Sequence, residues 1–397
     1  MKETGISWVP YIPNQWSIVR LKDIARLQSG DGITSDTIDD IGEYPVFGGN
    51  GLRGYTDKYT NEGNYVLIGR QGALCGNINY ASGKFFASEH AVVVYPHDKN
   101  ENTTWLGETL RAANLNRLSA SAAQPGLAVG ILNIQMIPYP PKEIRKRIGV
   151  YLDEKLAKID ERIEVLEKQQ DAYARLKKSV IHQAVTRGLD PDVRLKDSGI
   201  EWIGMIPEHW EVKRFKEFAS TTKGKQCDYY DSLGDNMAVV LTVDTLRKDI
   251  PSFYNYGYVE DKKQLCNETD IVVIWDGAGV GEFLKAKKGL LSSTIARIDI
   301  NAHKVLNRYL WQWRYNIEYR LKQAPTGMGI PHLSPNLLNN YLIPIPPLSE
   351  QQAIASYLDE KCAKIDAAIE NIGKQIDASK RLKRALINEV ITGQRAV

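Results

Sequence analysis

Apolar residues recur at alternating steps of four and three along two long stretches of the chain. The first stretch follows Pro140 and Pro141, and its apolar positions are Leu152, Leu156, Ile159, Ile163, Leu166, Tyr173, Leu176 and Val180. The second follows Pro346 and Pro347, and its apolar positions are Leu358, Cys362, Ile365, Ile369, Ile372, Ile376, Leu382 and Leu386. This spacing is typical of a coiled-coil seam. It predicts two helices of about 40 residues, each roughly 60 Å long at 1.5 Å per residue.

Helices of this length have no compact core of their own and need a partner along their length. The nearest partner for each helix is the other one. Each helix adjoins a block of more than 100 residues. Antiparallel packing places those blocks at opposite ends with a pseudo-two-fold relation, whereas parallel packing would crowd both at one end. We therefore favour an antiparallel coiled coil, which could be a simple connecting rod or a spacer whose length has a function.

The chain contains an internal duplication. Residues 151–160 and 357–366 read YLDEKLAKID and YLDEKCAKID, nine identities in ten at an offset of 206. A second motif recurs at an offset of 194, pairing Gly5, Ile6, Trp8, Ile12, Pro13 and Trp16 with Gly199, Ile200, Trp202, Ile206, Pro207 and Trp210. A period near 200 is a duplication of whole modules and not a solenoid. Two unlike inserts in one repeated frame indicate one task performed at two places with different specificities.

The inserts read as mixed α/β structure with short strands. Strands are predicted at 65–68, 91–95 and 271–274, and helices at 104–118 and 302–323. Glycine–alanine turns align between the inserts, as do Ser88 and Ser293, so both should share one fold. The predicted class is α+β. The predicted divisions are a first block (1–140), a helix (141–190), a second block (191–346) and a second helix (347–397).

Composition limits the class of protein. Hydrophobic residues make up 43% of the 397 residues, which excludes disorder of the whole chain. No apolar run approaches the roughly 18 residues of a membrane span, and the N-terminal residues do not read as a signal peptide. The four scattered cysteines form no CxxC pair, so we expect free thiols and no metal site. These features predict a cytoplasmic protein without a membrane segment.

Net charge is weakly positive, at +3. Residues 26–136 contain 8 Lys and Arg against 11 Asp and Glu, and residues 220–342 contain 15 against 13. A nucleic-acid binder with this balance must sort its basic groups onto one face, or a partner must neutralise many of the phosphates.

The glycine-rich turns do not match nucleotide-binding or catalytic motifs. The run from Gly277 to Gly281 lacks the third glycine of GxGxxG, and no Gly-Lys pair has the phosphate-loop spacing. HExxH and GxSxG are missing, and so is the Asn/Asp-Pro-Pro-Tyr/Phe motif of amino-methyltransferases. Tight turns with positive φ at glycine are the simpler interpretation. We therefore expect that the chain does not transfer methyl groups itself.

Polar loop residues remain as candidates for contact with DNA. Arginine suits guanine O6 and N7, and glutamine or asparagine suits adenine N6 and N7. For each single residue, a solvated loop position is the alternative. The candidates are Asn50, Arg53, Tyr55, Arg70, Gln71 and Gln124 in the first block and Lys223, Lys225, Gln226, Asp276, Thr326 and His332 in the second.

Together these features resemble the specificity (S) subunits of type I restriction–modification systems. The matching features are the duplicated Trp–Ile-Pro–Trp motif, the loop at 44–55, the strand–Gly-Ala turns, the exits at 137–141 and 343–347, and the YLDEKxAKID helices. The resemblance covers essentially the whole chain. It implies two target-recognition domains that each read half of an interrupted, asymmetric double-stranded DNA site, with the helices as spacer and docking region.

The resemblance also implies partners. These are two adenine-N6 methyltransferase (M) subunits with S-adenosylmethionine and two restriction (R) subunits that use ATP and Mg. The chain itself would carry no cofactor and no catalysis. A coiled-coil adaptor with protein- or glycan-binding end domains and a standalone enzyme are the competing hypotheses.

Overall fold

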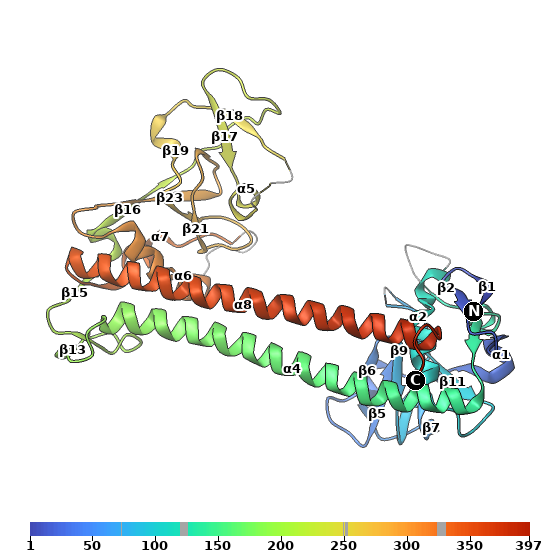
Figure 1. Cartoon of the computed structure of the whole chain (residues 1–397). Helices are drawn as coiled ribbons and strands as arrows, with labels where there is room; N and C mark the ends of the chain where they lie inside the picture. Colours follow the sequence, from blue (N-terminus) through green and yellow to red (C-terminus); the bar gives the residue numbers. More distant parts are fainter. Residues whose placement is uncertain (73, 120–125, 249, 251–252, 324–330) are drawn as a thin grey trace. The chain divides into compact units, whose positions relative to one another are not determined.

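The computed structural model describes all residues except 73, 120–125, 249, 251–252 and 324–330. The chain forms two compact units (Figure 1). Unit one comprises Met1–Gln169 and Ile372–Val397, and unit two comprises Gln170–Asn371. Each unit therefore contains one sheet-rich block and a part of both long helices. The four divisions predicted from the sequence separate the blocks from the long helices, whereas each compact unit contains parts of both helices. The four-part division stays a prediction.

The block of unit one contains two four-stranded sheets. The first sheet is antiparallel, in the order β4 (Ala25–Ser29), β11 (Ala91–Pro96), β8 (Tyr65–Gly69) and β9 (Ile78–Ala81). The second has the order β6 (Gly51–Thr56), β5 (Tyr44–Gly48), β10 (Lys84–Ala87) and β7 (Asn61–Glu62), with β5 and β10 parallel. The remaining elements are β1 (Lys2–Ile6), β2 (Val9–Ile12), β3 (Ser17–Arg20), β12 (Met136–Tyr139), α1 (Leu21–Ile24), α2 (Thr103–Ala112), α3 (Val129–Asn133), η1 (Ser35–Thr37) and η2 (Leu115–Leu118).

The block of unit two repeats this topology. Its antiparallel sheet has the order β16 (Ala219–Lys223), β23 (Ile295–Ile300), β20 (Ile271–Ile274) and β21 (Phe283–Lys285). Its second sheet has the order β18 (Tyr256–Tyr258), β17 (Met237–Leu241), β22 (Gly289–Leu291) and β19 (Leu265–Cys266). The other elements are β13 (Leu195–Asp197), β14 (Met205–Pro207), β15 (Glu211–Arg214), β24 (Leu342–Ile345), α5 (Val243–Arg247), α6 (Asn307–Gln323), α7 (Pro335–Asn339), η3 (Phe215–Glu217) and η4 (Lys262–Gln264). The prediction of one fold beneath two divergent inserts is confirmed.

The antiparallel sheet of unit one is covered on both faces. On the central strand β11, Val92 and Val94 belong to the cluster that contains Trp105 of α2. Val93 belongs to a separate cluster with Leu67. Alternate side chains of a strand point to opposite faces, so β11 supports two cores at once. Strand β20 of unit two divides its side chains in the same way.

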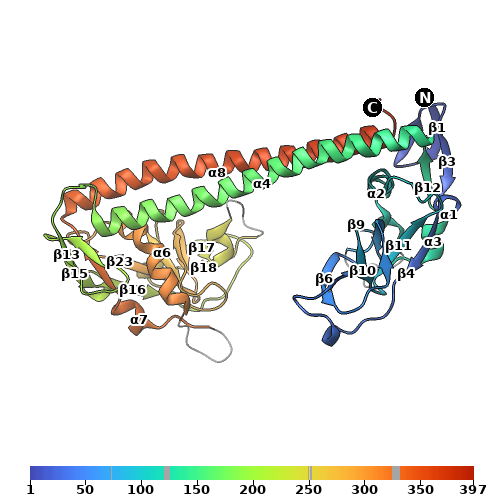
Figure 2. The same cartoon turned by 90° about the horizontal axis from the view of Figure 1, so that it is seen from below.

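The two predicted long helices are present as α4 (Lys142–Arg187) and α8 (Leu348–Ile391), with 46 and 44 residues. They lie side by side within each unit (Figure 2). In unit one, Asp160 pairs with Lys383 and Glu167 with Lys380, so rising numbers in α4 meet falling numbers in α8. Lys177 pairs with Asp366 in unit two. The helices are therefore antiparallel.

The seam between the helices is mostly apolar. Leu152, Leu156, Leu166, Leu358, Ile365, Ile372 and Ile376 are at most 8% exposed. Ile159, Ile163 and Ile369 are partly buried.

The seam prediction was wrong at three positions. Tyr173, Leu176 and Leu382 are 38%, 48% and 57% exposed. Strict alternation of four and three from Leu166 leads to Lys177 and not to Leu176, and from Ile376 it leads to Lys383 and not to Leu382. One residue turns a side chain by about 100° around a helix. Both leucines therefore point away from the partner helix, and lysines occupy the seam.

Those seam lysines repeat the sequence duplication in three dimensions. Lys177 and Lys383 are 206 residues apart, and so are their partners Asp366 and Asp160. Each Nζ lies 2.7 Å from its carboxylate. Each helix thus supplies the lysine to one ion pair and the aspartate to the other.

The ends of the helices are also anchored alike. Gly188, which follows α4, packs closely on Pro207 and Trp210, and a Cβ there would lie 3.3 Å from the Trp210 ring. Gly393, which follows α8, packs on Pro13 and Trp16 in the same manner. Both glycines have φ values, +75° and +70°, that favour glycine. In each unit, the repeated Pro–Trp motif therefore packs against the C-terminal end of a long helix.

Candidate nucleic-acid interface

At one end of the antiparallel sheet of unit one, several chain segments meet. Strand β11 is antiparallel to β4 and β8, so its first residues lie beside the last residues of those strands. The Arg70 backbone N–H donates to the His90 carbonyl at 2.8 Å, and the Leu127 N–H donates to the Arg70 carbonyl at 2.9 Å. Gln71 forms a β-bridge with Gly126. We name Ser29, Arg70, Gln71, His90 and Gly126 the first turn cluster.

A second loop is drawn against this cluster by glycines. A Cβ on Gly69 would lie 2.1 Å from the Gly49 carbonyl oxygen, and one on Gly49 would lie 3.1 Å from that of Gln71. Only glycine permits backbones to approach so closely. Asn50, next to Gly49, accepts a hydrogen bond from the Asn77 side-chain amide at 3.1 Å. The structure thus brings together three of the predicted residues, Asn50, Arg70 and Gln71.

Unit two builds the same backbone arrangement. The Trp275 N–H donates to the Thr294 carbonyl and the Leu333 N–H donates to the Trp275 carbonyl, both at 2.8 Å. Asp276 forms a β-bridge with His332. We name Lys223, Trp275, Asp276, Thr294 and His332 the second turn cluster.

The turns after β8 and β20 owe their shape to glycines with positive φ and do not form a nucleotide-binding motif. Gly72 and Gly76 have φ values of +87° and +86°, and Gly277 and Gly281 have +92° and +82°. The interpretation as tight turns is confirmed. These turns present the side chain just before the first glycine, Gln71 in one block and Asp276 in the other.

The side chains of the second turn cluster form a charged group. The two carboxylate oxygens of Asp276 lie 2.7 Å from Lys223 Nζ and 2.6 Å from His332 Nδ1. The aspartate side chain is 16% exposed, against 43% for the lysine and 51% for the histidine. Burial acts to raise the Asp276 pKa, but the hydrogen bonds from His332 and Lys223 outweigh it and hold the pKa below its ordinary value. The aspartate is therefore ionised and bonds both Lys223 and His332.

Other predicted residues stand apart from the clusters. Arg53 and Tyr55 lie on β6, where the Arg53 stem covers Gly48 and the Tyr55 backbone pairs with Asp39. Lys225 is 70% exposed and lies 3.9 Å from Asp261. Gln226 is exposed. The predictions for Gln124 and Thr326 lie outside the described residues.

Sequence reasoning missed Ser29, His90, Asn77 and Gly126. The available signal was the repeat itself, but the alignment was wrong by one residue at Ser88. The Ala91 N–H donates to the Ser88 carbonyl and the Ile295 N–H donates to the Ser292 carbonyl. Ser88 therefore corresponds to Ser292 and not to Ser293. The correct register matches His90 with Thr294, whose carbonyls accept the hydrogen bonds from Arg70 and Trp275.

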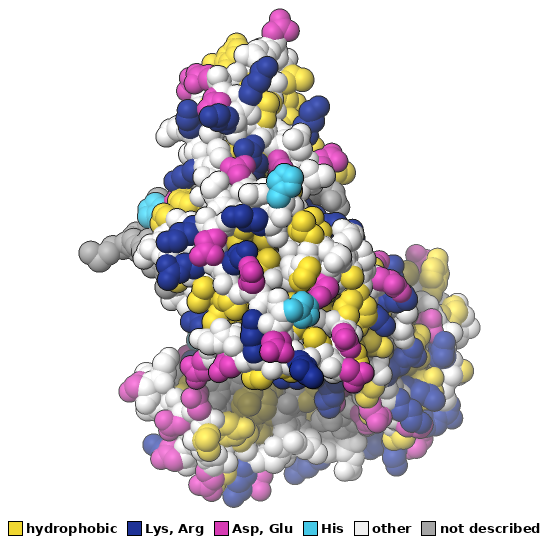
Figure 3. Space-filling model, turned by 90° about the vertical axis from the view of Figure 1, so that its left-hand side faces the viewer, with side chains coloured by type: hydrophobic (Ala, Val, Ile, Leu, Met, Phe, Trp, Pro, Cys, Tyr) yellow, Lys and Arg dark blue, Asp and Glu magenta, His cyan; other side chains and the backbone are white. Residues whose placement is uncertain are grey.

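The acidic balance of the first block has a local origin. Four of the eleven acids of residues 26–136 lie between positions 36 and 43, a segment without Lys or Arg. Two more, Glu101 and Glu108, are buried partners of Arg145 and Arg111. On the face of unit two drawn in Figure 3, basic and acidic side chains are also intermixed. The basic groups on that face are thus not gathered into one large patch.

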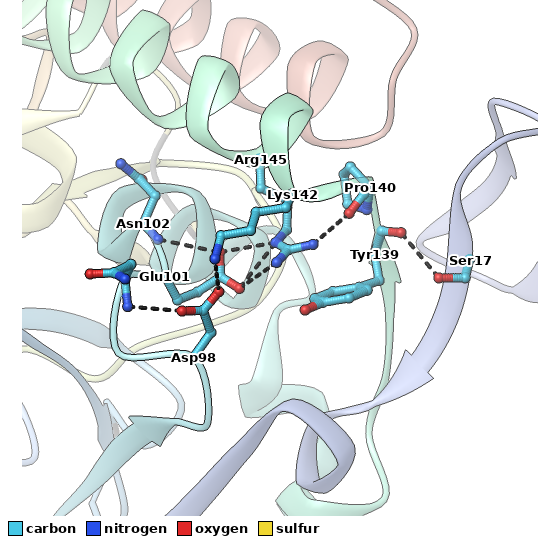
Figure 4. Close-up of polar contacts among 9 residues, drawn as sticks. Ser17, Asp98, Glu101, Asn102, Tyr139, Pro140, Lys142 and Arg145 are labelled. Carbon is cyan, nitrogen blue, oxygen red and sulfur yellow. Dashed lines mark hydrogen bonds and ion pairs between the residues drawn. The ribbon is translucent and has the colours of Figure 1, made fainter.

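The junction between the first block and α4 is held by a buried ion pair (Figure 4). Arg145 is 4% exposed, lies 2.9 Å from Glu101, and donates to the Pro140 carbonyl at 2.7 Å. Its guanidinium lies 3.9 Å from the centroid of the Tyr139 ring. An open groove of about 1,020 Å³ runs beside this junction and includes Lys99, Lys142 and Lys146. This groove therefore lies at the helix junction and not at the first turn cluster.

Unit two secures its helix without a charge. Gln351 occupies the position of Arg145, is fully buried, and donates to the carbonyls of Lys304 and Pro346 at 2.9 Å. The Leu306 N–H donates to the Gln351 side chain at 2.8 Å. Both junctions thus tie the first turns of a long helix to the segment before a block helix.

Two features are missing among the described residues. Among them, no group of three or more His, Cys, Asp and Glu side chains is arranged to hold a metal ion. None of their helices is both long and apolar enough to cross a membrane.

Comparison with known proteins gives one family. The family described as "Type I restriction modification DNA specificity domain" matches residues 13–170 and 207–377. The EcoprrI specificity subunit of Escherichia coli is 42% identical over 137 residues, which are 34% of this chain and 34% of that protein. The MjaVIII specificity subunit of Methanocaldococcus jannaschii is 33% identical over 188 residues, 47% of this chain and 43% of that protein. The matches thus span less than half the length of these two curated relatives.

A solved structure shares the fold along the whole chain. It is described as "Structural basis underlying complex assembly and conformational transition of the type I R-M system". The TM-score is 0.72 at 17% identity, and the match covers 97% of this chain and 100% of the other.

Proposed function

This chain belongs to the type I restriction modification DNA specificity domain family, and on that premise we propose that its two blocks each read one half of a bipartite double-stranded DNA site. The observation that carries the proposal is the repeated turn scaffold. Equivalent backbone hydrogen bonds hold the turns after β8 and β20, yet the side chains that these turns present differ. One fold with two sets of polar side chains suits the reading of two different base sequences, so the target is asymmetric.

In this proposal the antiparallel helices act as the spacer and as the docking region for methyltransferase subunits. The apolar seam and the two reciprocal ion pairs support pairing of the helices in one register. The buried junctions at Arg145 and Gln351 tie each block to a helix. A fixed gap between the half-sites follows from such a spacer.

The chain itself would supply recognition and no catalysis. We propose that two methyltransferase subunits bring S-adenosylmethionine, and that two restriction subunits bring ATP and Mg. The weak net charge of +3 supports shared contact with DNA, because partners would then neutralise many of the phosphates. The assembly would work in the cytoplasm. The alternative of an adaptor with protein- or glycan-binding ends is not favoured by any contact in the turn clusters.

Mapping of methylated adenines tests the proposal. The chain is expressed with a candidate type I methyltransferase subunit from its own genome, in a host without other adenine methylation. Two unlike half-sites with a constant gap are expected, and cells without this chain should show no such motif. Methylation that is unchanged without the chain, or a motif without a gap, would contradict the proposal.

A further inference from the structure

The two turn clusters carry different side chains at three matched backbone positions. The first position ends β4 or β16 and precedes a glycine whose N–H donates to the start of the neighbouring strand at 3.0 Å. The second position directly follows Arg70 or Trp275. The third position forms a β-bridge with the second. The matched pairs are Ser29 and Lys223, Gln71 and Asp276, and Gly126 and His332.

We propose that Lys223, held by Asp276, reads a guanine in the half-site of the second block, and that Gln71 reads an adenine at the equivalent place in the first. This inference rests on the proposed function. A lysine only donates hydrogen bonds, and guanine offers the acceptors O6 and N7 together in the major groove. A glutamine side chain donates and accepts, which matches N7 and N6 of adenine.

The ion pair favours a base over a phosphate as the partner of Lys223. Asp276 neutralises the ammonium at 2.7 Å, so the pair as a whole has no net charge to exchange for counterions. Lys223 would then contribute to DNA binding mainly through directional hydrogen bonds. The Trp275 ring, with its centroid 6.0 Å from Nζ, flanks the same ammonium. The donor is therefore held in place before DNA binds, which reduces the entropy lost on binding.

Asp276 acts through Lys223 and is a positioning residue. Its carboxylate is mostly buried, and its two oxygens already bond Lys223 and His332. In the first block the equivalent Gln71 is exposed and needs no such support. This assignment changes the role predicted from the sequence, where Asp276 was itself a candidate for base contact.

Selection of duplexes from a randomised pool by the assembled complex tests the assignment. Lys223→Gln should lower the preference for guanine at one position of the second half-site by about 5- to 150-fold, the discrimination of one bidentate contact. All other positions and the slope of affinity against salt should stay unchanged. Asp276→Asn should relax the same position only. Lys216→Gln on η3 makes the same charge change and should leave the motif intact.

A transplant provides the reciprocal test. The triple variant S29K/Q71D/G126H moves the second cluster into the first block. A Cβ on Gly126 would lie 3.7 Å from the Arg70 carbonyl oxygen, an ordinary contact, so a side chain fits there. Guanine should replace adenine at one position of the first half-site. The thermal unfolding temperature of each variant shows whether a changed base preference results from loss of the fold.

The outcomes are distinct. If Lys223→Gln weakens all duplexes equally and reduces the salt slope by about one phosphate, Lys223 is a backbone contact and the assignment is wrong. An unchanged second half-site would also overturn it. A wild-type complex that selects no bipartite motif would instead refute the proposed function itself.

Discussion

At the scale of single residues, Arg145 and Gln351 occupy equivalent positions of the repeat, and both anchor a long helix although only one of them is charged. Both bond the carbonyl of the same repeated proline, Pro140 or Pro346. The arginine needs the carboxylate of Glu101, because a buried charge without a partner is costly. The glutamine instead bonds only backbone groups. The two junctions therefore respond differently to substitution.

Arg145→Met should destabilise the chain by about 3–5 kcal/mol, because it leaves the Glu101 carboxylate buried and unpaired. Denaturant unfolding measures the change. The matched double variant R145Q/E101Q removes both charges and should recover most of the loss. Equal losses in the single and double variants would show that packing against Tyr139, and not charge, dominates.

Asp276 predicts a dependence of stability on acid. Its pKa in the folded chain is below the ordinary value, so folding favours the ionised form. The stabilisation is fully present above an unfolded-state pKa of about 3.9 and is lost as pH falls through the lower folded-state value. Unfolding free energy should therefore fall more steeply below about pH 4 in the wild type than in Asp276→Asn. Parallel curves would contradict this account.

At the scale of elements, the seam explains both the success and the failure of the sequence prediction. Leu152 and Ile376 were predictable because apolar spacing is a property of one helix. Lys177 was missed because a lysine in a seam is explained only by Asp366 on the other helix. Strand pairing was out of reach for the same reason: β4 and β11 meet across more than 60 residues. The turn clusters depend on that pairing, so Ser29 and Gly126 carried no signal of their own.

The reciprocal ion pairs should make the helix register sensitive to charge. Asp160→Lys places a lysine against Lys383 and should cost about 1 kcal/mol of unfolding free energy, within the range of partly exposed pairs. The swap D160K/K383D should restore stability to within about 0.5 kcal/mol. The equivalent variants at Lys177 and Asp366 provide a matched control in unit two. A swap as unstable as its single variants would argue against the pair as a register device.

At the scale of the whole molecule, the duplication makes half of the chain self-complementary. Residues 1–190 contain one copy of the seam with both Asp160 and Lys177, which are equivalent to the Asp366 and Lys383 that the second copy supplies. This fragment should form a homodimer, since a self-complementary surface pairs with its own copy. Sedimentation should show a dimer, and binding selection should yield a palindrome of the first half-site. A folded monomer would argue against pairing through the repeat.

The spacer itself is tested by shortening both helices together. Deleting 164–170 and 370–376 removes one heptad from each helix, keeps the phase of the seam, and retains Asp160, Lys177, Asp366 and Lys383. Each helix loses roughly 10 Å at 1.5 Å per residue. At about 3.4 Å per base pair, the gap between the half-sites should shorten by roughly three base pairs while both half-sites stay the same. The single deletions break the register and should reduce binding. If the gap stays constant while the half-sites change, the helices do not set the spacing, and the blocks alone determine where each half-site begins.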